Sequence, residues 1–128
     1  MSFAGRVNRK ARSDRNHVIY EVLNKKTGDT YVGITFVRPP TRKLTRSKMP
    51  IKSALDRFTS HCYRAEKGSK TLFHKNIRQF GKDSFSVSVL EIVRGKSAAH
   101  QREIELMHSL QPKLNMTSML INTSYTDN

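Results

Sequence analysis

Two short segments of alternating polarity, separated by a turn-forming stretch, constrain the fold more than any other feature of the sequence. Residues 18–23 (VIYEVL) and 30–35 (TYVGIT) are rich in the β-branched and aromatic side chains that favour strands. The stretch between them, NKKTGD, has the composition of a hairpin turn. In the second segment Val32 and Ile34 share the face that we expect to pack inward, and Tyr31 lies on the opposite face. The sequence therefore predicts an antiparallel hairpin.

The remainder of the chain predicts three helices and a third strand. The predicted helices cover residues 51–66, 71–80 and 97–110, and the predicted strand covers residues 85–91. Ser97 is a good N-cap for the last helix, Pro112 stops that helix, and Gly81 is a favoured residue just after the end of the middle one. We therefore expect a small α/β domain of the α+β kind, with a three-stranded, mainly antiparallel sheet flanked by helices.

The strongest compositional feature is a formal net charge of +14, from 24 Lys and Arg against 10 Asp and Glu. Such an excess repels itself in a compact chain, so it indicates a polyanionic partner. A basic binding protein of the ribosomal or chromatin kind fits this charge, and so does an enzyme that acts on nucleic acid.

Much of the positive charge lies in two segments. Residues 1–16 are rich in Arg and poor in acids, which is typical of a transit peptide or of an arm on nucleic acid; the lack of apolar periodicity favours the arm. Residues 36–50 contain no acid and have prolines toward both ends, so we expect a basic loop inserted in the domain. We expect this loop to contact a DNA backbone, although a merely solvated loop is the alternative. Its cations are Arg38, Arg42, Lys43, Arg46 and Lys48. The folded domain then spans residues 17–116, and residues 117–128 form a polar tail.

Several other kinds of protein are disfavoured. No apolar run approaches the roughly 20 residues needed to cross a bilayer, so we expect no membrane partner. Cys62 is the only cysteine, which excludes an intrachain disulfide. The histidines are scattered, without paired cysteines or a His-Glu-x-x-His spacing, so zinc is not expected.

The most anomalous residue is Glu103, in the last predicted helix. The residues that lie within about 60° of it on that helix are Ala99, Leu106, Met107 and Leu110. Glu103 is therefore at the centre of the inward-facing stripe, whereas Glu105 points to solvent. A buried carboxylate needs a cation, a hydrogen-bond network or a metal. The spacing leaves open whether Glu103 binds a metal or pairs with a buried arginine.

A second candidate group lies on one flank of the first predicted helix. Arg57 and His61 are one helical turn apart, and Arg64 continues the row. Arginine offers a fixed fork of donors for a phosphate, and a neighbouring histidine can orient a group or move a proton. We expect Arg64 to contact DNA. Such rows are usually just solvated, so the pattern needs support from elsewhere.

Tyr20 and Tyr31 form a third group, on the two strands of the predicted hairpin. A tyrosine in a short strand is ordinarily a packing residue. Gly33 beside Tyr31 leaves room for something large to approach the backbone. The two phenols are therefore candidates for contact with a phosphate.

Together these residues resemble the GIY-YIG endonuclease family. The segments VIY (residues 18–20) and YVG (residues 31–33) are similar to the two halves of its motif, with valine in place of the first glycine and of the second isoleucine. Arg57 and His61 match the family's helix arginine and histidine. Glu103 matches its metal-binding glutamate, and Asn115 its final asparagine.

The resemblance covers residues 18–115, and further residues in this range indicate one branch of the family. The run NIRQFGKDSF, residues 76–85, followed by VLE at 89–91, is similar to the phage and intron-encoded homing endonucleases. The stretch between Gly33 and Arg57 looks longer than in compact members, and the excess is the basic insertion. This departure affects how DNA would be engaged rather than the chemistry.

The resemblance implies a metal-dependent DNA endonuclease in the cytoplasm of a bacterium or a phage-infected host. The implied catalytic residues are Tyr20, Tyr31, Arg57, His61 and Glu103. Glu103 would bind Mg2+ or Mn2+, while Gly33 and Asn115 would support the motif structurally. Arg57 would hold the scissile phosphate, and Tyr20 would be the general base, with His61 and the metal as candidates to adjust its pKa. Tyr31 would position the water or the phosphate.

Some alternatives stay open. One active site cuts one strand, so cleavage of a duplex needs a second protomer, two sequential nicks or a branched substrate. A structure-specific repair nuclease would share the chemistry and differ in the DNA that it selects. A non-catalytic basic nucleic-acid-binding protein that keeps the fold is a third hypothesis, which the joint presence of all the catalytic residues disfavours.

Overall fold

The computed structural model describes residues 14–115, so the predicted arm up to residue 13 and the chain from residue 116 lie outside the described residues. The strands are β1 (Asn16–Asn24), β2 (Thr30–Phe36) and β3 (Phe85–Arg94). The helices are α2 (Met49–Glu66), α3 (Leu72–Phe80) and α4 (Lys96–Leu110). Short 3-10 turns cover Arg46–Lys48, Lys82–Ser84 and Lys113–Asn115.

The strands form one antiparallel sheet in the order β2-β1-β3. In the central strand, Tyr20 lies opposite Gly33 of β2 and Val89 of β3. The register of β1 against β3 shifts between Ile19 and Tyr20. The predicted fold class is confirmed: an α+β domain with a three-stranded antiparallel sheet and flanking helices. β2 and β3 are the edge strands, and β2 is the one that matters for the site.

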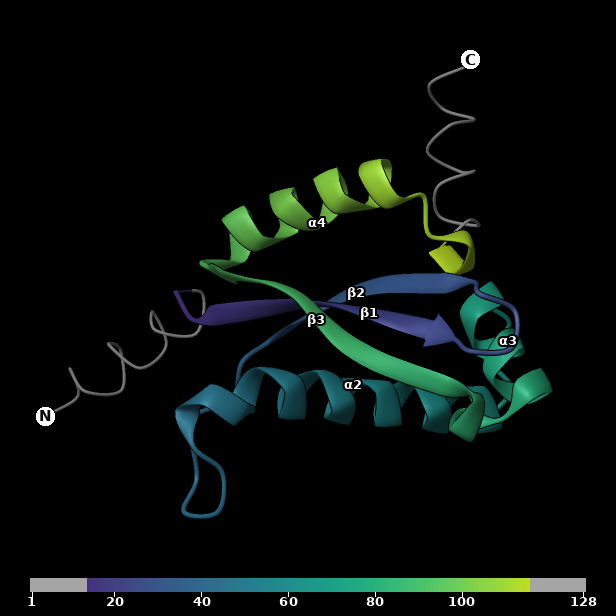
Figure 1. The fold of residues 1–128 in the computed structure, drawn as a ribbon, viewed down its shortest axis with the longest axis horizontal. Helices are drawn as coiled ribbons and strands as arrows, with labels where there is room; N and C mark the ends of the chain where they lie inside the picture. Colours follow the sequence, from purple (N-terminus) through teal and green to yellow (C-terminus); the bar gives the residue numbers. More distant parts are fainter. Residues whose placement is uncertain (1–13, 116–128) are drawn as a thin grey trace, which may run out of the picture.

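Helices cover both faces of this sheet (Figure 1): α2 and α4 lie on opposite sides, and α3 packs beside α2. The main core lies between the sheet and the α2–α3 pair. Its buried members are Val18, Tyr20, Val22, Ala54, Ala65, Phe73, Ile77, Phe85 and Leu114. Because β1 is covered on both faces, its consecutive residues Val18, Ile19 and Tyr20 are all fully buried. No helix within residues 14–115 is both long enough and apolar enough to span a bilayer.

Side chains on both faces of β2 pack inward, whereas the sequence predicted inward packing for one face. Val32 is buried as expected, whereas Ile34 is only half-buried. Tyr31, on the opposite face, also packs against the core, and its ring stacks on Phe73 of α3 with 3.9 Å between the centroids. The candidate site tyrosine is therefore also a packing residue.

The start of α4 differs from the prediction. The helix begins at Lys96 and its N-cap is Gly95, so the prediction of Ser97 as the N-cap is wrong. Gly95 has φ of 93°, a conformation that favours glycine, and its carbonyl accepts a hydrogen bond from the backbone N–H of Ala99 at 3.0 Å. The chain can therefore turn from β3 into α4 without a polar side-chain cap.

The predicted basic loop is shorter than residues 36–50. Phe36 ends β2, a 3-10 turn forms over Arg46–Lys48, and α2 already starts at Met49. Pro50 lies in the first turn of α2, where its missing N–H has no helical partner to lose. Proline at the end of this segment therefore marks the beginning of a helix and not the continuation of a loop.

Candidate active site

β2 carries a glycine where the Tyr20 ring lies against it. A β-carbon placed on Gly33 would be 2.5 Å from the Tyr20 hydroxyl oxygen and 2.9 Å from the Tyr31 ring. These separations are well below van der Waals contact, so only glycine fits without displacing a ring. Gly33 therefore allows the phenol of the central strand to reach the edge strand.

The Tyr20 hydroxyl meets His61 of α2. Tyr20 is fully buried, and its hydroxyl lies 3.4 Å from Nε2 of His61. His61 is itself buried, and its ring makes edge-on contacts with Tyr31 and Phe73 at centroid distances of 5.4 and 5.0 Å. The flank of α2 predicted from the sequence thus borders both tyrosines.

A cavity of about 330 Å3 lies beside these rings. Its walls include Tyr31, Arg57, His61 and Arg64, together with the first turn of α3. Arg57 is half-buried and Arg64 is exposed, and neither has an acidic partner in the described part of the chain. The cavity is therefore positively charged and has the donors that an anion such as a phosphate needs.

Glu103 approaches from the other face of the sheet, on α4. Its side chain is 15 % exposed whereas that of Glu105 is 51 % exposed, as the helical phase predicts. Arg102 pairs with Glu91 at 2.9 Å and with Glu105 at 3.1 Å. In the described residues Glu103 makes one ionic contact, to Nδ1 of His100 at 3.6 Å. The alternative of a buried arginine partner is thus not realised within residues 14–115.

This carboxylate is weakly compensated. Burial raises the pKa of Glu103, and the partly exposed His100 offsets the rise only in part. Leu110, which the same stripe includes, is 44 % exposed because it is the last residue of the helix and not part of the packed stretch. A carboxylate in this position gains from a cation that enters the site.

Glu103, Arg57 and the two phenols interact electrostatically. Burial is the largest cause of the raised pKa of Tyr20, with Tyr31 second and Glu103 also contributing. For Tyr31, the pKa is raised first by burial and next by the charge of Glu103. Arg57 opposes the rise at both phenols. Arg57 lines the cavity beside Tyr31, whereas Glu103 and the buried Tyr20 do not, so Glu103 is linked to the two phenols through its charge.

In the protein alone, burial outweighs the opposing charge of Arg57, so the pKa of Tyr20 is raised. His61, one of the two groups expected to adjust this pKa, does not act as a cation. Burial first, and then Arg57, His74 and Arg64, lower the pKa of His61 to about 3. At neutral pH His61 is therefore an uncharged ring, with one nitrogen that can accept a hydrogen bond.

Asn115 closes the outer edge of β2. Its Oδ1 accepts a hydrogen bond from the Val32 N–H at 2.8 Å, and its Nδ2 donates to the Val32 carbonyl at 3.0 Å. This pair of bonds satisfies the backbone of an edge residue in the way that another strand would. Asn115 also lines the cavity, so it fixes the strand that carries Tyr31 next to the space a ligand would occupy.

The predicted DNA-binding residues of the basic loop are all exposed. They are Arg38, Arg42, Lys43, Arg46 and Lys48. Arg38 is partly neutralised by Asp56 of α2, at 3.3 Å. The loop precedes the N-terminus of α2 (Figure 1), and Arg57 lies eight residues after Met49, about 12 Å along the helix axis. The loop and the cavity thus follow one another along α2.

Sequence reasoning missed His74. Its Nε2 lies 2.9 Å from Nδ1 of His61, and it is 6 % exposed. The only local feature of His74 is its position three residues after Thr71, the N-cap of α3. The Thr71 hydroxyl accepts a hydrogen bond from the His74 N–H. Nothing in the spacing indicates that the first turn of α3 meets the middle of α2.

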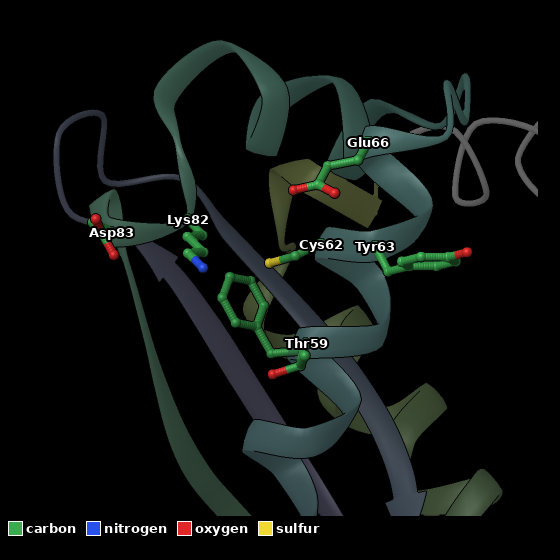
Figure 2. A pocket seen from close by; sticks show the side chains of 7 residues that line it. Thr59, Cys62, Tyr63, Glu66, Lys82 and Asp83 are labelled. Atoms are coloured by element: carbon green, nitrogen blue, oxygen red, sulfur yellow. The ribbon is translucent and has the colours of Figure 1, made fainter.

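A second hollow lies on the opposite side of α2 (Figure 2). Thr59, Cys62 and Glu66 project from α2 toward Lys82, and the volume is about 360 Å3. None of the predicted site residues lines it. Burial raises the pKa of the Cys62 thiol, which makes it a poor nucleophile. Among the described residues, no arginine or histidine lines this hollow, whereas Arg57, His61 and Arg64 line the cavity beside Tyr31, which is therefore the candidate active site.

Comparisons of the chain with protein-family models, with curated proteins and with solved structures found no match. The geometry of the cavity and the residues of the sequence motif are therefore the observations that bear on function.

Proposed function

We propose that this protein is a metal-dependent DNA endonuclease of the GIY-YIG type, which hydrolyses phosphodiester bonds. The proposal depends on one observation: Tyr31, Arg57 and His61 line one positively charged cavity, His61 hydrogen-bonds the buried Tyr20, and the charge of Glu103 acts on both phenols. They come from β1, β2, α2 and α4. Packing of a small domain does not require such a combination, whereas hydrolysis of a phosphodiester uses every part of it.

Arg57 holds the scissile phosphate. Its guanidinium is half-buried in the cavity wall, without an acidic partner in residues 14–115, so its donors are available to phosphate oxygens. The same contact strengthens as charge develops in the transition state. Arg64 lies two turns further along the same side of α2 and binds a neighbouring phosphate.

Tyr20 is the general base. Because its pKa is raised, the resting group is a phenol, and its oxygen accepts the proton of the attacking water as its own proton passes to Nε2 of His61. The water oxygen bonds to phosphorus, and the bond from phosphorus to the leaving sugar oxygen breaks. Tyr20 has no exposed surface in the free protein, so a neighbouring side chain must move when DNA binds. Tyr31, in the cavity wall, orients the phosphate.

Glu103 fits a divalent cation. Within residues 14–115 no group of three or more His, Cys, Asp or Glu could hold a metal, so a site here has to depend on few protein ligands. Mg2+ suits this case because it keeps several waters and needs one or two carboxylates. Bound to Glu103, Mg2+ or Mn2+ would supply Lewis-acid stabilisation of the charge that develops on the phosphate and the leaving oxygen.

A plasmid assay tests this function. Supercoiled plasmid is incubated with the protein in Mg2+, Mn2+ or EDTA, and the rate of nicking is compared for wild type, Arg57→Ala and Arg94→Ala. We expect metal-dependent nicking that EDTA abolishes and that Arg57→Ala slows by about 100-fold or more. Arg94→Ala is the matched control, because it removes an equal charge from an exposed position at the end of the opposite edge strand.

Two outcomes would reject the function. Equal nicking by wild type and Arg57→Ala would place the activity elsewhere, or in a contaminant. Binding of DNA without nicking in either metal, across a range of salt, would leave the non-catalytic basic binder. Replacing plasmid with branched and linear oligonucleotide duplexes then separates the repair-type alternative from the homing type.

A further inference from the structure

The hydrogen bonds of Tyr20 do not end at His61. Nδ1 of His61 and Nε2 of His74 are 2.9 Å apart, and Nδ1 of His74 and Oγ of Ser69 are 2.5 Å apart. The two histidines are 5 % and 6 % exposed, while Ser69 is half-buried. A continuous chain of polar groups thus leads from the Tyr20 hydroxyl to the segment that joins α2 and α3.

The surroundings favour the neutral form of both histidines. Burial is the first cause of the lowered pKa of each ring, and Arg57 and Arg64 add to it in both. A neutral imidazole carries one N–H, so each ring donates through one nitrogen and accepts through the other. The hydrogen-bond chain then has two possible directions. Tyr20 donates to His61 in one direction and accepts from His61 in the other.

Burial of Tyr20 selects one direction. If Nε2 of His61 carried the hydrogen, it would donate to Tyr20, and the Tyr20 hydroxyl hydrogen would have no acceptor within residues 14–115. A buried donor without a partner is costly and rare. In the other direction Tyr20 donates to His61, His61 donates through Nδ1 to His74, and His74 donates through Nδ1 to Ser69. Tyr20 and both buried histidines then each have a partner for their hydrogen.

We propose that His74, fixed by Ser69, is a positioning residue that holds His61 in the Nδ1–H tautomer, with Nε2 free to take the Tyr20 proton. This inference rests on the proposed function for its catalytic consequence. When His61 gains that proton at Nε2, its Nδ1–H can move toward His74, so the charge is shared between two rings.

The protein holds this pair in place through backbone contacts. The Thr71 hydroxyl accepts the His74 N–H at 3.2 Å, which sets the start of α3. Arg78 donates to the carbonyls of Ala65 and Ser69, both at 2.7 Å, and so joins the end of α2 to the segment before α3. Ser69 is thereby fixed opposite His74.

The tautomers can be measured without any activity. Nitrogen-15 NMR of the histidine rings between pH 6 and 8 should show His61 and His74 neutral, each protonated at Nδ1. His74→Ala should remove this preference at His61, while His108→Ala, which replaces an exposed histidine on α4, should leave it unchanged. A proton on Nε2 of His61 in the wild type, or a charged His74 at pH 7, overturns the proposal even if the protein cuts DNA.

Cleavage tests the catalytic consequence. Under single-turnover conditions with plasmid and Mg2+, His74→Ala should slow nicking by about tenfold or more while the DNA affinity stays within about twofold, as for other residues that orient a reacting histidine. His74→Gln should recover most of the rate, because its side-chain carbonyl can accept the same Nδ1–H. Ser69→Ala should fall between wild type and His74→Ala.

The variants also separate a positioning role from a structural one. Equal losses in His74→Ala and His74→Gln, or a loss that follows the melting temperature, overturn positioning. A wild type that does not nick, with the predicted tautomers present, rejects the proposed function and leaves the tautomer assignment intact.

Discussion

Gly33 is the glycine at which an added β-carbon would collide with the site tyrosines. Its missing side chain is what lets the Tyr20 hydroxyl approach β2, with the Tyr31 ring on the other side of the same space. The sequence indicated an open spot at Gly33, but not that Tyr20 of the partner strand fills it. That assignment needs the register of β1 against β2.

Gly33→Ala should therefore displace a buried phenol. The new β-carbon would lie 2.5 Å from the Tyr20 oxygen and 2.6 Å from Cζ of the same ring. We expect the free energy of unfolding to fall by about 1–3 kcal/mol, as in other overpacked cores, and nicking to be lost. Urea denaturation and the plasmid assay measure the two effects. Wild-type stability together with wild-type nicking would show that Tyr20 is not held as described.

The two tyrosines should respond differently to loss of the hydroxyl. Tyr20 hydrogen-bonds a histidine that can take its proton, whereas the Tyr31 ring is held mainly by stacking on Phe73. Tyr20→Phe should lower the single-turnover rate by about 100-fold or more, as for loss of a general base, and Tyr31→Phe should lower it less. Both variants keep their rings and should stay folded. If Tyr31→Phe is the slower enzyme, the general base is assigned to the wrong phenol.

At the scale of elements, the proposed site draws on four segments: β2 and α2 line the cavity, β1 carries Tyr20, and α4 covers the other face of the sheet (Figure 1). Alternation and turn chemistry predict β1 and β2 from the sequence, and helical phase predicts that Glu103 faces inward while Glu105 does not. The start of α4 escaped prediction because a glycine with positive φ replaced the expected side-chain cap. His74 escaped because its role depends on where α3 lies against α2, which local patterns do not encode.

The basic loop before α2 should extend the DNA-binding surface. Replacing Arg42, Lys43 and Arg46 with alanine removes exposed charges that have no acidic partner in the described chain. The slope of log affinity against log salt should then decrease in magnitude by about 0.9 for each phosphate contact that is lost. Fluorescence anisotropy with a short duplex measures it. The control replaces three exposed lysines outside the loop, Lys25, Lys26 and Lys96, with alanine, and an equal change there would mean that net charge alone is responsible.

For the whole molecule, a net charge of +14 and a buried pair of neutral histidines set its response to pH and salt. Unfolded His61 has its ordinary pKa of 6.5, whereas the folded protein lowers this pKa to about 3. As pH falls through this window, the unfolded chain takes up a proton that the folded one does not. A depressed histidine pKa therefore makes the folded state less stable toward acid.

The free energy of unfolding should accordingly decrease as pH falls from 7 to 4. His61 contributes a slope of up to about 1.4 kcal/mol per pH unit once its unfolded form is protonated, and His74 acts in the same direction. Urea denaturation at several pH values measures the slope. His61→Gln should flatten it and His108→Gln should not. The same slope in wild type and His61→Gln would mean that His61 is not held neutral.

The nicking rate of Glu103→Gln tests the central claim most directly. The substitution keeps the size of a side chain on the packed side of α4 and removes the charge proposed to hold Mg2+; Glu105→Gln makes the same change at a position that is 51 % exposed. Under single-turnover conditions with plasmid and Mg2+, we predict that Glu103→Gln nicks at least about 100-fold more slowly than Glu105→Gln, with both folded and both binding DNA. Equal rates in the two variants would contradict a metal-dependent nuclease site at this carboxylate.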